Sequence, residues 1–463
     1  MSINSQALFR KARLSRDARF DGSFFIAVKT TGIYCRPICP APSPKECNVE
    51  YFSTSIAALN HGYRPCLRCR PDSAPGSSAW KGNNTSFDRA ISLINEGVLT
   101  SKSVCQLAER LGISSRYLNT LFRKNLGTSV KNYAQHQQLM FAKSLLQQTS
   151  MSITDIAFAS GFKSLRRFND CFQKKLKLTP SNLRKNKSTT TNQIRLFLSY
   201  RPPYAWLHLR DFLQKRAISP IEWTTKNSYG RTFSWRCNKS ESESEFIYGQ
   251  FTATHDNKKH GFKIKISISD INYLMPIINN IRRILDLDAA IENIDEQLQG
   301  LKGFNEPLCL GLRVPGTWDL FEAGVRAILG QQISVIGALK LVSTLVERYG
   351  IKKGDMTLFP TPKNLLSGDL TELKMPNSRR ETLKNFSRYM KENPKAPPDN
   401  WLEIKGIGPW TVAYAKMRGL SNPNIWLGSD LVIKKVVAHH NANLKPENAS
   451  PWQSYLTLQI WNL

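Results

Sequence analysis

Four cysteines form two close pairs near the start of the chain. Three residues separate Cys35 from Cys39, two separate Cys66 from Cys69, and 26 lie between the pairs. This spacing lets four thiolates hold one zinc ion in a tetrahedral site. Zinc has no redox chemistry of its own, so the spacing alone indicates a structural site that stabilises a small domain without a large core.

A second candidate site lies near the other end of the chain. The segment LEIKGIGPWTVAYAKMRGL places a Gly-Ile-Gly turn between two amphipathic helices. Its small residues let backbone amides approach a DNA phosphate, usually with help from a bound monovalent cation, so Lys405, Gly406 and Gly408 are candidate DNA contacts. A tight turn between two helices is the structural alternative. About twenty residues further on, Asp430 precedes an apolar helix, where an isolated aspartate is most often a helix cap.

The charge of the chain indicates a polyanionic partner. Its 463 residues include 65 Lys and Arg against 35 Asp and Glu, a formal net charge of +30, which disfavours an ordinary metabolic enzyme. Residues 1–187 hold 29 of the basic and 10 of the acidic residues. A solvated surface that keeps the protein soluble is the alternative. No apolar run approaches the roughly 20 residues that span a bilayer, which predicts a cytoplasmic protein with no membrane partner.

Two polar segments, Ser73 to Ser86 and Lys185 to Gln193, read as linkers that divide the chain. Between them, helical apolar spacing around Gly112 and again around Gly161 predicts two helix-turn-helix units in tandem. Alternating runs such as FKIKISISI then predict strands up to about Ile271, interrupted by the polar loop KSESESE, and helices follow. The predicted multidomain fold comprises a small zinc-bound α/β head (1–76), an all-α tandem helix-turn-helix domain (84–187), a small α+β domain (192–273) and an all-α helix-hairpin-helix domain (274–463).

The stretches TTGIYCRPICPA and GYRPCLRCRPD make residues 4 to 72 resemble the N-terminal domain of the Ada methylphosphotriester-repair proteins. The resemblance implies that Cys35, the first zinc ligand, irreversibly takes a methyl group from a methylated DNA phosphate. It also implies that Arg36, Arg64, Arg68 and Arg70 contact the DNA backbone. Methylation removes one anionic ligand from the site, so repulsion from DNA falls and repair becomes an affinity switch. A purely structural zinc site is the alternative.

Residues 87 to about 185 resemble the DNA-binding domain of AraC-type regulators, most specifically in GFKSLRRFNDCFQKKLKLTPSNLR. The resemblance makes the second helix of each unit, near Ser114 to Lys124 and Ser164 to Lys175, a candidate reader of the major groove. The expected contacts are Arg116, Asn119, Arg123, Arg166, Arg167 and Asn169. Which of them read bases and which bind phosphate stays open. Promoter DNA and RNA polymerase are the partners that such an activator implies; a plain helical bundle is the alternative.

The half from Leu196 to Leu463 resembles the alkylation-repair glycosylase AlkA, through RPPYAW, VPGTWDLFEAGVRAILGQQIS, WLGSDLVIKK and LTLQIWNL. The resemblance implies that Asp430 is the catalytic carboxylate and that Val314 is the wedge that fills the gap left by a flipped base. It also implies an aromatic pocket that attracts cationic alkylated purines such as 3-methyladenine. The rings of this pocket are Phe212, Trp410, Tyr414 and Trp461.

Two positions bear on the reaction that the resemblance implies. Trp410 stands where strand-cutting glycosylases carry a Schiff-base lysine, so hydrolysis without strand cleavage is expected. Ser429 stands where the family often has another acid. The sequence therefore predicts a bacterial-type, nucleoid-associated fusion of a single-turnover methyl acceptor, a transcriptional activator and a monofunctional 3-methyladenine glycosylase. The alternative is a transcriptional regulator whose glycosylase-like half is inactive.

Overall fold

The structure of the chain is a computed structural model. It describes residues 3–17, 20–21, 24–69, 71, 85–184, 193–237, 246–394, 396–440 and 443–463. Most of both predicted linkers and the KSESESE loop lie outside the described residues, although Thr85 and Ser86 already belong to a helix. Among the described residues, no helix is long and apolar enough to cross a membrane.

The head is a small sheet with helices around it. Its four strands lie in the order β3-β1-β2-β4, and β4 runs parallel to β2 while the other pairs are antiparallel. The elements are α1 (Ile3–Leu14), β1 (Phe25–Val28), β2 (Ile33–Cys35), η2 (Glu46–Asn48), β3 (Val49–Phe52), α2 (Ser55–Asn60) and β4 (Arg64–Pro65). The first cysteine pair thus begins at the end of β2, and the second pair follows β4, its hydrogen-bonded neighbour.

The next domain is all-α and contains the two predicted helix-turn-helix units. Its helices are α3 (Thr85–Asn95), α4 (Val98–Ser101), α5 (Val104–Arg110), α6 (Ser115–Leu126), α7 (Val130–Gln148), α8 (Ile153–Ala159), α9 (Leu165–Leu176) and α10 (Pro180–Leu183). Ser114 and Ser164 cap α6 and α9, each accepting a backbone N–H through its hydroxyl. The long helix α7 joins the two units and buries His136 and Lys143 among its apolar residues.

An antiparallel sheet of order β5-β9-β8-β7-β6 follows. Its elements are β5 (Ile194–Ser199), α11 (Trp206–Gln214), β6 (Glu222–Thr224), β7 (Ser228–Arg236), β8 (Phe246–Asp256) and β9 (Gly261–Ile268). The register opposes Tyr229 to Ala253 and Phe251 to Ile266, so alternate apolar side chains lie on one face. Short 3-10 turns, η5 (Asn257–Lys259) and η6 (Ile271–Tyr273), flank β9.

The last domain is helical apart from one small hairpin, β10 (Ile351–Lys353) and β11 (Met356–Leu358), which the sequence did not predict. The predicted helix-hairpin-helix is present as η7 (Pro398–Glu403), a turn, and α18 (Pro409–Gly419). The remaining elements are α12 (Leu274–Ile284), α13 (Ile291–Gln299), α14 (Leu320–Gly330), α15 (Val335–Tyr349), α16 (Pro362–Ser367), α17 (Asn377–Glu392), α19 (Leu431–His440), η8 (Pro446–Ala449) and α20 (Gln453–Trp461).

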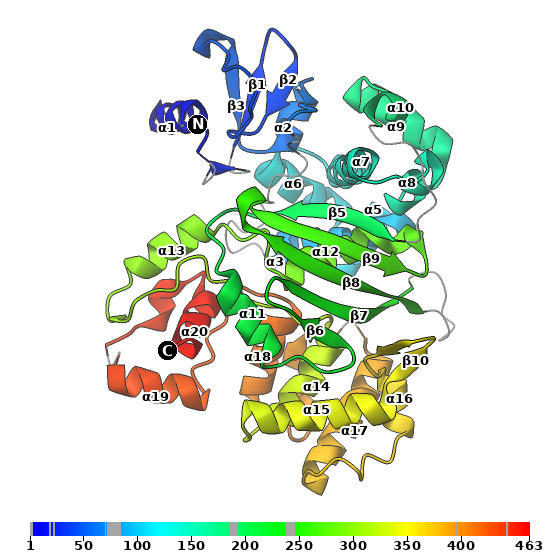
Figure 1. Cartoon of the computed structure of the whole chain (residues 1–463), viewed down its shortest axis with the longest axis vertical. Helices are drawn as coiled ribbons and strands as arrows, with labels where there is room; N and C mark the ends of the chain where they lie inside the picture. Colours follow the sequence, from blue (N-terminus) through cyan, green and yellow to red (C-terminus); the bar gives the residue numbers. More distant parts are fainter. Residues whose placement is uncertain are drawn as a thin grey trace.

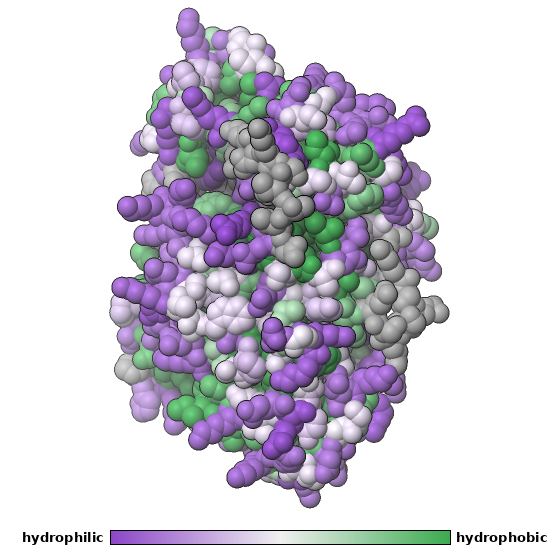
Figure 2. Space-filling model, turned by 45° about the vertical axis from the view of Figure 1, so that its right-hand side comes forward, coloured by the Kyte–Doolittle hydropathy of each residue, from purple (hydrophilic) through white to green (hydrophobic). Residues whose placement is uncertain are grey.

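The domains are packed against one another. Figure 1 shows the head at one end of the molecule, the five-stranded sheet across the middle, and α15 to α17 at the other end. One hydrophobic cluster includes Tyr34 of the head, Leu145 of α7 and Phe262 of β9. A backbone N–H of β5, at Phe197, also donates to the side chain of Gln148 (2.7 Å). On the face in Figure 2 hydrophilic side chains dominate and hydrophobic ones are scattered among them.

A buried ion cluster joins the sheet to α14. The guanidinium of Arg231 pairs with Glu322 (2.7 Å) and Glu222 (3.4 Å), and Arg326 pairs with the same two carboxylates. Arg231 and Glu322 are at most 2% exposed. Burial raises the pKa of Glu222, but Arg326 and Arg231 outweigh it and lower that pKa to about 2. The two positive charges therefore balance the two negative ones inside the protein.

We expect Arg231→Met to destabilise the fold by about 3–5 kcal/mol, because it leaves two buried carboxylates with Arg326 as their one remaining cation in the cluster. Arg231 lies 5.6 Å from the ring of Trp318, so chemical unfolding can be followed by tryptophan fluorescence. The matched control is Arg210→Gln, which removes a partly exposed pair with the adjacent Asp211 and should cost less than about 1 kcal/mol. Equal losses in the two variants would contradict a structural role for the cluster.

Candidate active site and DNA-binding surfaces

The four predicted zinc ligands lie together. The Sγ atoms of Cys35, Cys39, Cys66 and Cys69 are all within 4.8 Å of one another. Thiols this close cannot all ionise unless a cation balances them. Accordingly, the hydrogen bond to Cys39 raises the pKa of Cys35, while the hydrogen bond to Cys35 lowers that of Cys66. Four convergent sulfurs are the ligand set of a structural or thiolate-type zinc site, so the cluster fits Zn²⁺.

The structure corrects the prediction that Arg36 contacts DNA. Its guanidinium forms an ion pair with Asp21 and donates to the carbonyl of Cys69 (3.2 Å), and its side chain is only 11% exposed. The backbone N–H of Arg36 lies 3.3 Å from Cys69 Sγ, so the residue holds the two cysteine loops together. Of the other predicted head contacts, Arg64 is half-buried and Arg68 is exposed. Arg70 lies outside the described residues.

Five of the six predicted helix-turn-helix contacts are exposed: Arg116, Arg123, Arg166, Arg167 and Asn169. Asn119 is the exception and is a correction. Its amide nitrogen donates to the carbonyl of Ser115 (2.9 Å), and its amide oxygen accepts the backbone N–H of Val130 (3.2 Å). The amide nitrogen is therefore bonded within α6 and the amide oxygen joins α6 to α7, so the side chain is held inside the domain and is only half-exposed.

The hairpin before α18 is supported from behind by α17. Thr382 Oγ1 donates to the carbonyl of Lys405 (3.1 Å), and Gln331 Nε2 donates to the carbonyl of Gly406 (3.0 Å). Gly406 has a φ of +91°, and a Cβ there would collide with Thr382. Gly408 is the N-cap residue of α18, and a Cβ there would meet no atom within 4 Å. Lys405 and Gly406 are exposed, so this turn can be approached by a ligand from outside.

We expect Gly406→Ala to lower stability by about 1–3 kcal/mol, because alanine is strained at this φ and Thr382 blocks its Cβ. Gly408→Ala is the matched control, which should leave thermal unfolding unchanged. If the hairpin grips a phosphate, both variants should weaken binding to undamaged duplex DNA in a fluorescence anisotropy titration. Identical unfolding curves would contradict the steric argument, and unchanged DNA affinity in both would contradict the hairpin's assignment.

Asp430 lies at the start of α19, with its carboxylate surrounded by N–H donors. Trp410 Nε1 donates to Oδ2 (3.1 Å), and Trp461 Nε1 donates to Oδ1 (3.3 Å). The backbone N–H groups of Val432 (3.0 Å) and Ile433 (3.4 Å) also donate to Oδ1, so the residue caps the helix as well. These donors and the positive end of the helix dipole stabilise a negative charge at this position.

The four predicted pocket rings gather beside Asp430. Trp410 and Tyr414 stack with centroids 5.3 Å apart, one helical turn apart on α18. Phe212, from α11, lies parallel to Trp461 at 6.4 Å with an interplanar angle of 21°. Phe212 is only 8% exposed, whereas the other three rings are half-buried. The structure therefore brings the predicted carboxylate and the predicted rings into one site.

Sequence reasoning missed two arginines at this site. Arg216 lies over the ring of Phe212, and Arg418 lies over both Phe212 and Tyr414. Arg418 follows Tyr414 by four residues on α18, the spacing that brings helical side chains together. Arg216 follows Phe212 by the same number, although it lies just beyond the end of α11. That spacing was the available signal.

The structure contradicts the assignment of Val314 as the DNA wedge. Its side chain is 4% exposed and packs in the hydrophobic cluster that also contains Leu312 and Tyr455. Its backbone N–H donates to Asp286 (3.0 Å), whose carboxylate also accepts the hydroxyl of Tyr455 (2.8 Å). A side chain enclosed in this way cannot enter a duplex from this position.

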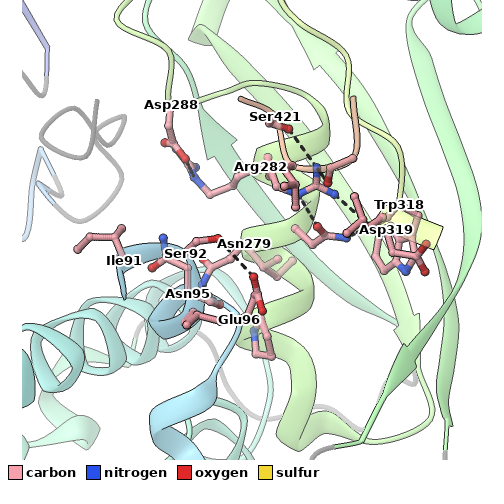
Figure 3. Close-up of a pocket in the computed structure, with 18 of the residues that line it drawn as sticks. Ile91, Ser92, Asn95, Glu96, Asn279, Arg282, Asp288, Trp318, Asp319 and Ser421 are labelled. Carbon is pink, nitrogen blue, oxygen red and sulfur yellow. Dashed lines mark hydrogen bonds and ion pairs between the residues drawn. The ribbon is translucent and has the colours of Figure 1, made fainter. Parts of the chain in front are cut away.

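A cavity of about 1340 Å³ lies elsewhere, where the helix-turn-helix domain meets the last two domains. Figure 3 shows Ser92 and Asn95 of α3, and Glu96 just after it, on the side of the cavity opposite Asn279 and Arg282 of α12. Asn279 Nδ2 donates to the carbonyl of Asn95 (2.9 Å), so the walls are joined. Asp430 is not among the lining residues. The cavity is therefore an interdomain space and not the candidate active site.

The structure combines a cluster of four cysteines, tandem helix-turn-helix units and a helix-hairpin-helix domain in which Asp430 caps a helix. This combination defines a protein of DNA repair and gene regulation. Three family descriptions match the chain accordingly: "Metal binding domain of Ada" over residues 9–72, "Helix-turn-helix domain" over 107–186 and "AlkA N-terminal domain" over 195–319. The chain belongs to the family of bifunctional transcriptional activator/DNA repair enzymes of the AlkA type.

The relatives support this assignment at full length and in each half. The probable bifunctional transcriptional activator/DNA repair enzyme AlkA of Mycobacterium tuberculosis (strain ATCC 25618 / H37Rv) is 30% identical, covering 97% of this chain and 95% of the relative. DNA-3-methyladenine glycosylase 2 of Escherichia coli (strain K12) is 32% identical, covering 57% and 95%. The bifunctional transcriptional activator/DNA repair enzyme AdaA of Bacillus subtilis (strain 168) is 32% identical, covering 38% and 80%.

Proposed function

We propose that the C-terminal half hydrolyses the N-glycosidic bond of alkylated purines such as 3-methyladenine in double-stranded DNA. The observation that carries this proposal is the Asp430 carboxylate, which accepts both indole N–H groups of the aromatic site. A base turned out of the stack would lie among the rings, where cation-π attraction favours a cationic base by about 0.5–2 kcal/mol per ring. Asp430 would stabilise the positive charge that develops on the sugar and would orient the attacking water.

The reaction would stop at an abasic site. Trp410, and not a lysine, stands at the first turn of α18 and donates to Asp430, so no amine there can form a Schiff base with the sugar. The hairpin at Lys405, Gly406 and Gly408 would hold a phosphate through its amides, with a monovalent cation as an additional ligand.

We infer that the head is a single-turnover methyl acceptor. Cys35, Cys39, Cys66 and Cys69 would hold Zn²⁺, which keeps the thiolates ionised. Cys35 Sγ would attack the methyl carbon of a phosphotriester, forming an S–C bond while the C–O bond breaks and leaves a phosphodiester anion. Loss of one anionic ligand would strengthen DNA binding by the exposed arginines of α6 and α9.

In this proposal the methylated protein binds promoter DNA and activates transcription through RNA polymerase, in association with the bacterial nucleoid. Arg166 and Arg167 at the exposed start of α9, and Arg116 and Arg123 on α6, are the candidate DNA contacts. Asn169 is the remaining exposed candidate for reading a base.

The test is incubation of the purified protein with methylated duplex DNA, followed by chromatography of free bases and a denaturing gel. We expect release of 3-methyladenine with the strand intact until alkali cleaves it. Strand cleavage by the protein alone would contradict the monofunctional assignment. No release by a folded, DNA-binding protein would favour the alternative, a transcriptional regulator with an inactive glycosylase-like domain, which the buried Val314 and the absence of an acid at Ser429 support.

A further inference from the structure

Two guanidinium groups lie against rings of the aromatic site, and neither forms one of the hydrogen bonds to Asp430. The Cζ atom of Arg216 lies 3.8 Å from the centroid of the Phe212 ring, and that of Arg418 lies 4.7 Å from the same centroid. Arg418 also lies 5.7 Å from the ring of Tyr414. Because these rings already attract a guanidinium cation, their cation-π attraction for a second cation, such as a charged base, is weaker.

Protein contacts hold both guanidinium groups in place. Arg418 donates to the carbonyl of Pro315 and to the hydroxyl of Tyr414 (3.2 Å), and Arg216 donates to the carbonyl of Phe212 (3.4 Å). All of these acceptors are uncharged, and neither arginine forms an ion pair within the part of the chain that the structure describes. Burial lowers the pKa of Arg216 to about 10, which still leaves it charged at neutral pH.

The charges of the site are therefore separated along a row of rings. Arg216 stacks on Phe212, Phe212 lies parallel to Trp461, and Trp461 donates to Asp430. The positive end of this row lies beside the rings that would hold the base. The negative end lies at the carboxylate that would face the sugar.

We propose that Arg216 determines how the site discriminates between cationic and neutral damaged bases; this inference rests on the proposed glycosylase function. A cationic base is repelled by Arg216 when it binds. When the bond between C1′ and the base nitrogen breaks, its electron pair goes to the base and the positive charge goes to the sugar. A cationic base then leaves neutral, and a neutral base leaves as an anion that takes a proton from solvent. Water adds its oxygen to C1′ and releases a proton.

The charge of the base falls by one unit in both cases, so Arg216 favours bond breaking equally for both. It opposes binding only for the cationic base. Removing the charge should therefore slow the chemical step for both bases and tighten binding for the cationic base alone. For the cationic base the two effects cancel in kcat/KM, whereas for the neutral base kcat/KM falls.

The experiment compares Arg216→Met with the wild type on two duplexes of the same sequence, one with 7-methylguanine and one with hypoxanthine. We expect the single-turnover rate at saturation to fall about tenfold for both bases. The KM should fall about tenfold for 7-methylguanine only, so the ratio of the two kcat/KM values rises about tenfold. Affinity for the 7-methylguanine duplex, measured by anisotropy in an Asp430→Asn background, should rise in parallel without any turnover.

Two controls separate charge from shape. Arg216→Lys keeps the charge and should keep the wild-type ratio, whereas Arg210→Gln removes an arginine of α11, the helix that precedes Arg216, and should change neither constant. Equal losses of kcat/KM for both bases in Arg216→Met would show a structural role and overturn the inference. An unchanged ratio would overturn it as well. If the wild type releases neither base, the proposed function fails and this inference fails with it.

Discussion

Replacing Asp430 with asparagine is expected to reduce base release by about a thousandfold while DNA binding is retained. The amide has the same shape, and asparagine caps a helix as well as aspartate does, so α19 keeps its N-terminus. What is lost is the negative charge that, in the proposed mechanism, faces the sugar. The measurement is single-turnover release of 3-methyladenine, with DNA affinity measured separately by anisotropy.

Asp399→Asn is the matched control for this variant. It removes an exposed carboxylate that pairs with Lys416 of α18. The net charge therefore changes by the same amount as in Asp430→Asn, and the change is again next to α18, whose Trp410 donates to Asp430. We expect its rate to match the wild type. Turnover by Asp430→Asn at the wild-type rate would rule out Asp430 as the catalytic carboxylate, and loss of activity in both variants would indicate a general effect of charge.

Methyl transfer to the head is expected to add one methyl group to Cys35 and then to stop. Intact-protein mass spectrometry after exposure to DNA bearing methylphosphotriesters should show a single added methyl, and peptide mapping should place it on Cys35. Cys35→Ala should take up none, because the remaining thiolates are not the first ligand that the Ada resemblance identifies as the acceptor. Cys47→Ala, at an exposed cysteine outside the cluster, should behave as the wild type does.

The peptide map also distinguishes a zinc site that accepts a methyl group from a zinc site that is purely structural. An unmethylated Cys35 under saturating DNA would leave the cluster as a structural zinc site. A methyl group on Cys39, Cys66 or Cys69 would keep the acceptor function but move it to another ligand. Because the map is made on the wild-type protein, this result does not depend on whether the Cys35 variant folds.

Features that depend on local spacing could be predicted from the sequence. The cysteine pairs, the two helix-turn-helix units and the hairpin around Gly406 all follow from residues close together in the chain. The grouping of Asp430 with Trp410 and Trp461 came from a resemblance and not from spacing, since Trp461 lies 31 residues from Asp430. The structure shows the physical reason for that grouping, which is one carboxylate shared by two indoles.

Features that depend on contacts between distant segments could not be predicted. Val314 is buried because the segment around Tyr455 packs over its loop, and Arg36 is unavailable because Asp21 binds it. Asn119 was chosen for its side-chain type, although its amide closes the corner between α6 and α7. In each case the residue type is suitable for a contact with DNA, but contacts within the fold hold the side chain.

The hydrophobic cluster shared by Tyr34, Leu145 and Phe262 makes the two halves of this chain depend on each other for burial. The carbonyl of Asp21 also accepts the guanidinium of Arg201 (2.6 Å), which joins the head to the C-terminal half directly. Separating the chain between residues 184 and 193 would expose both sides of this contact to water, at a cost proportional to the apolar area uncovered. Either piece of this chain, produced alone, is therefore expected to be less stable than it is in the whole protein.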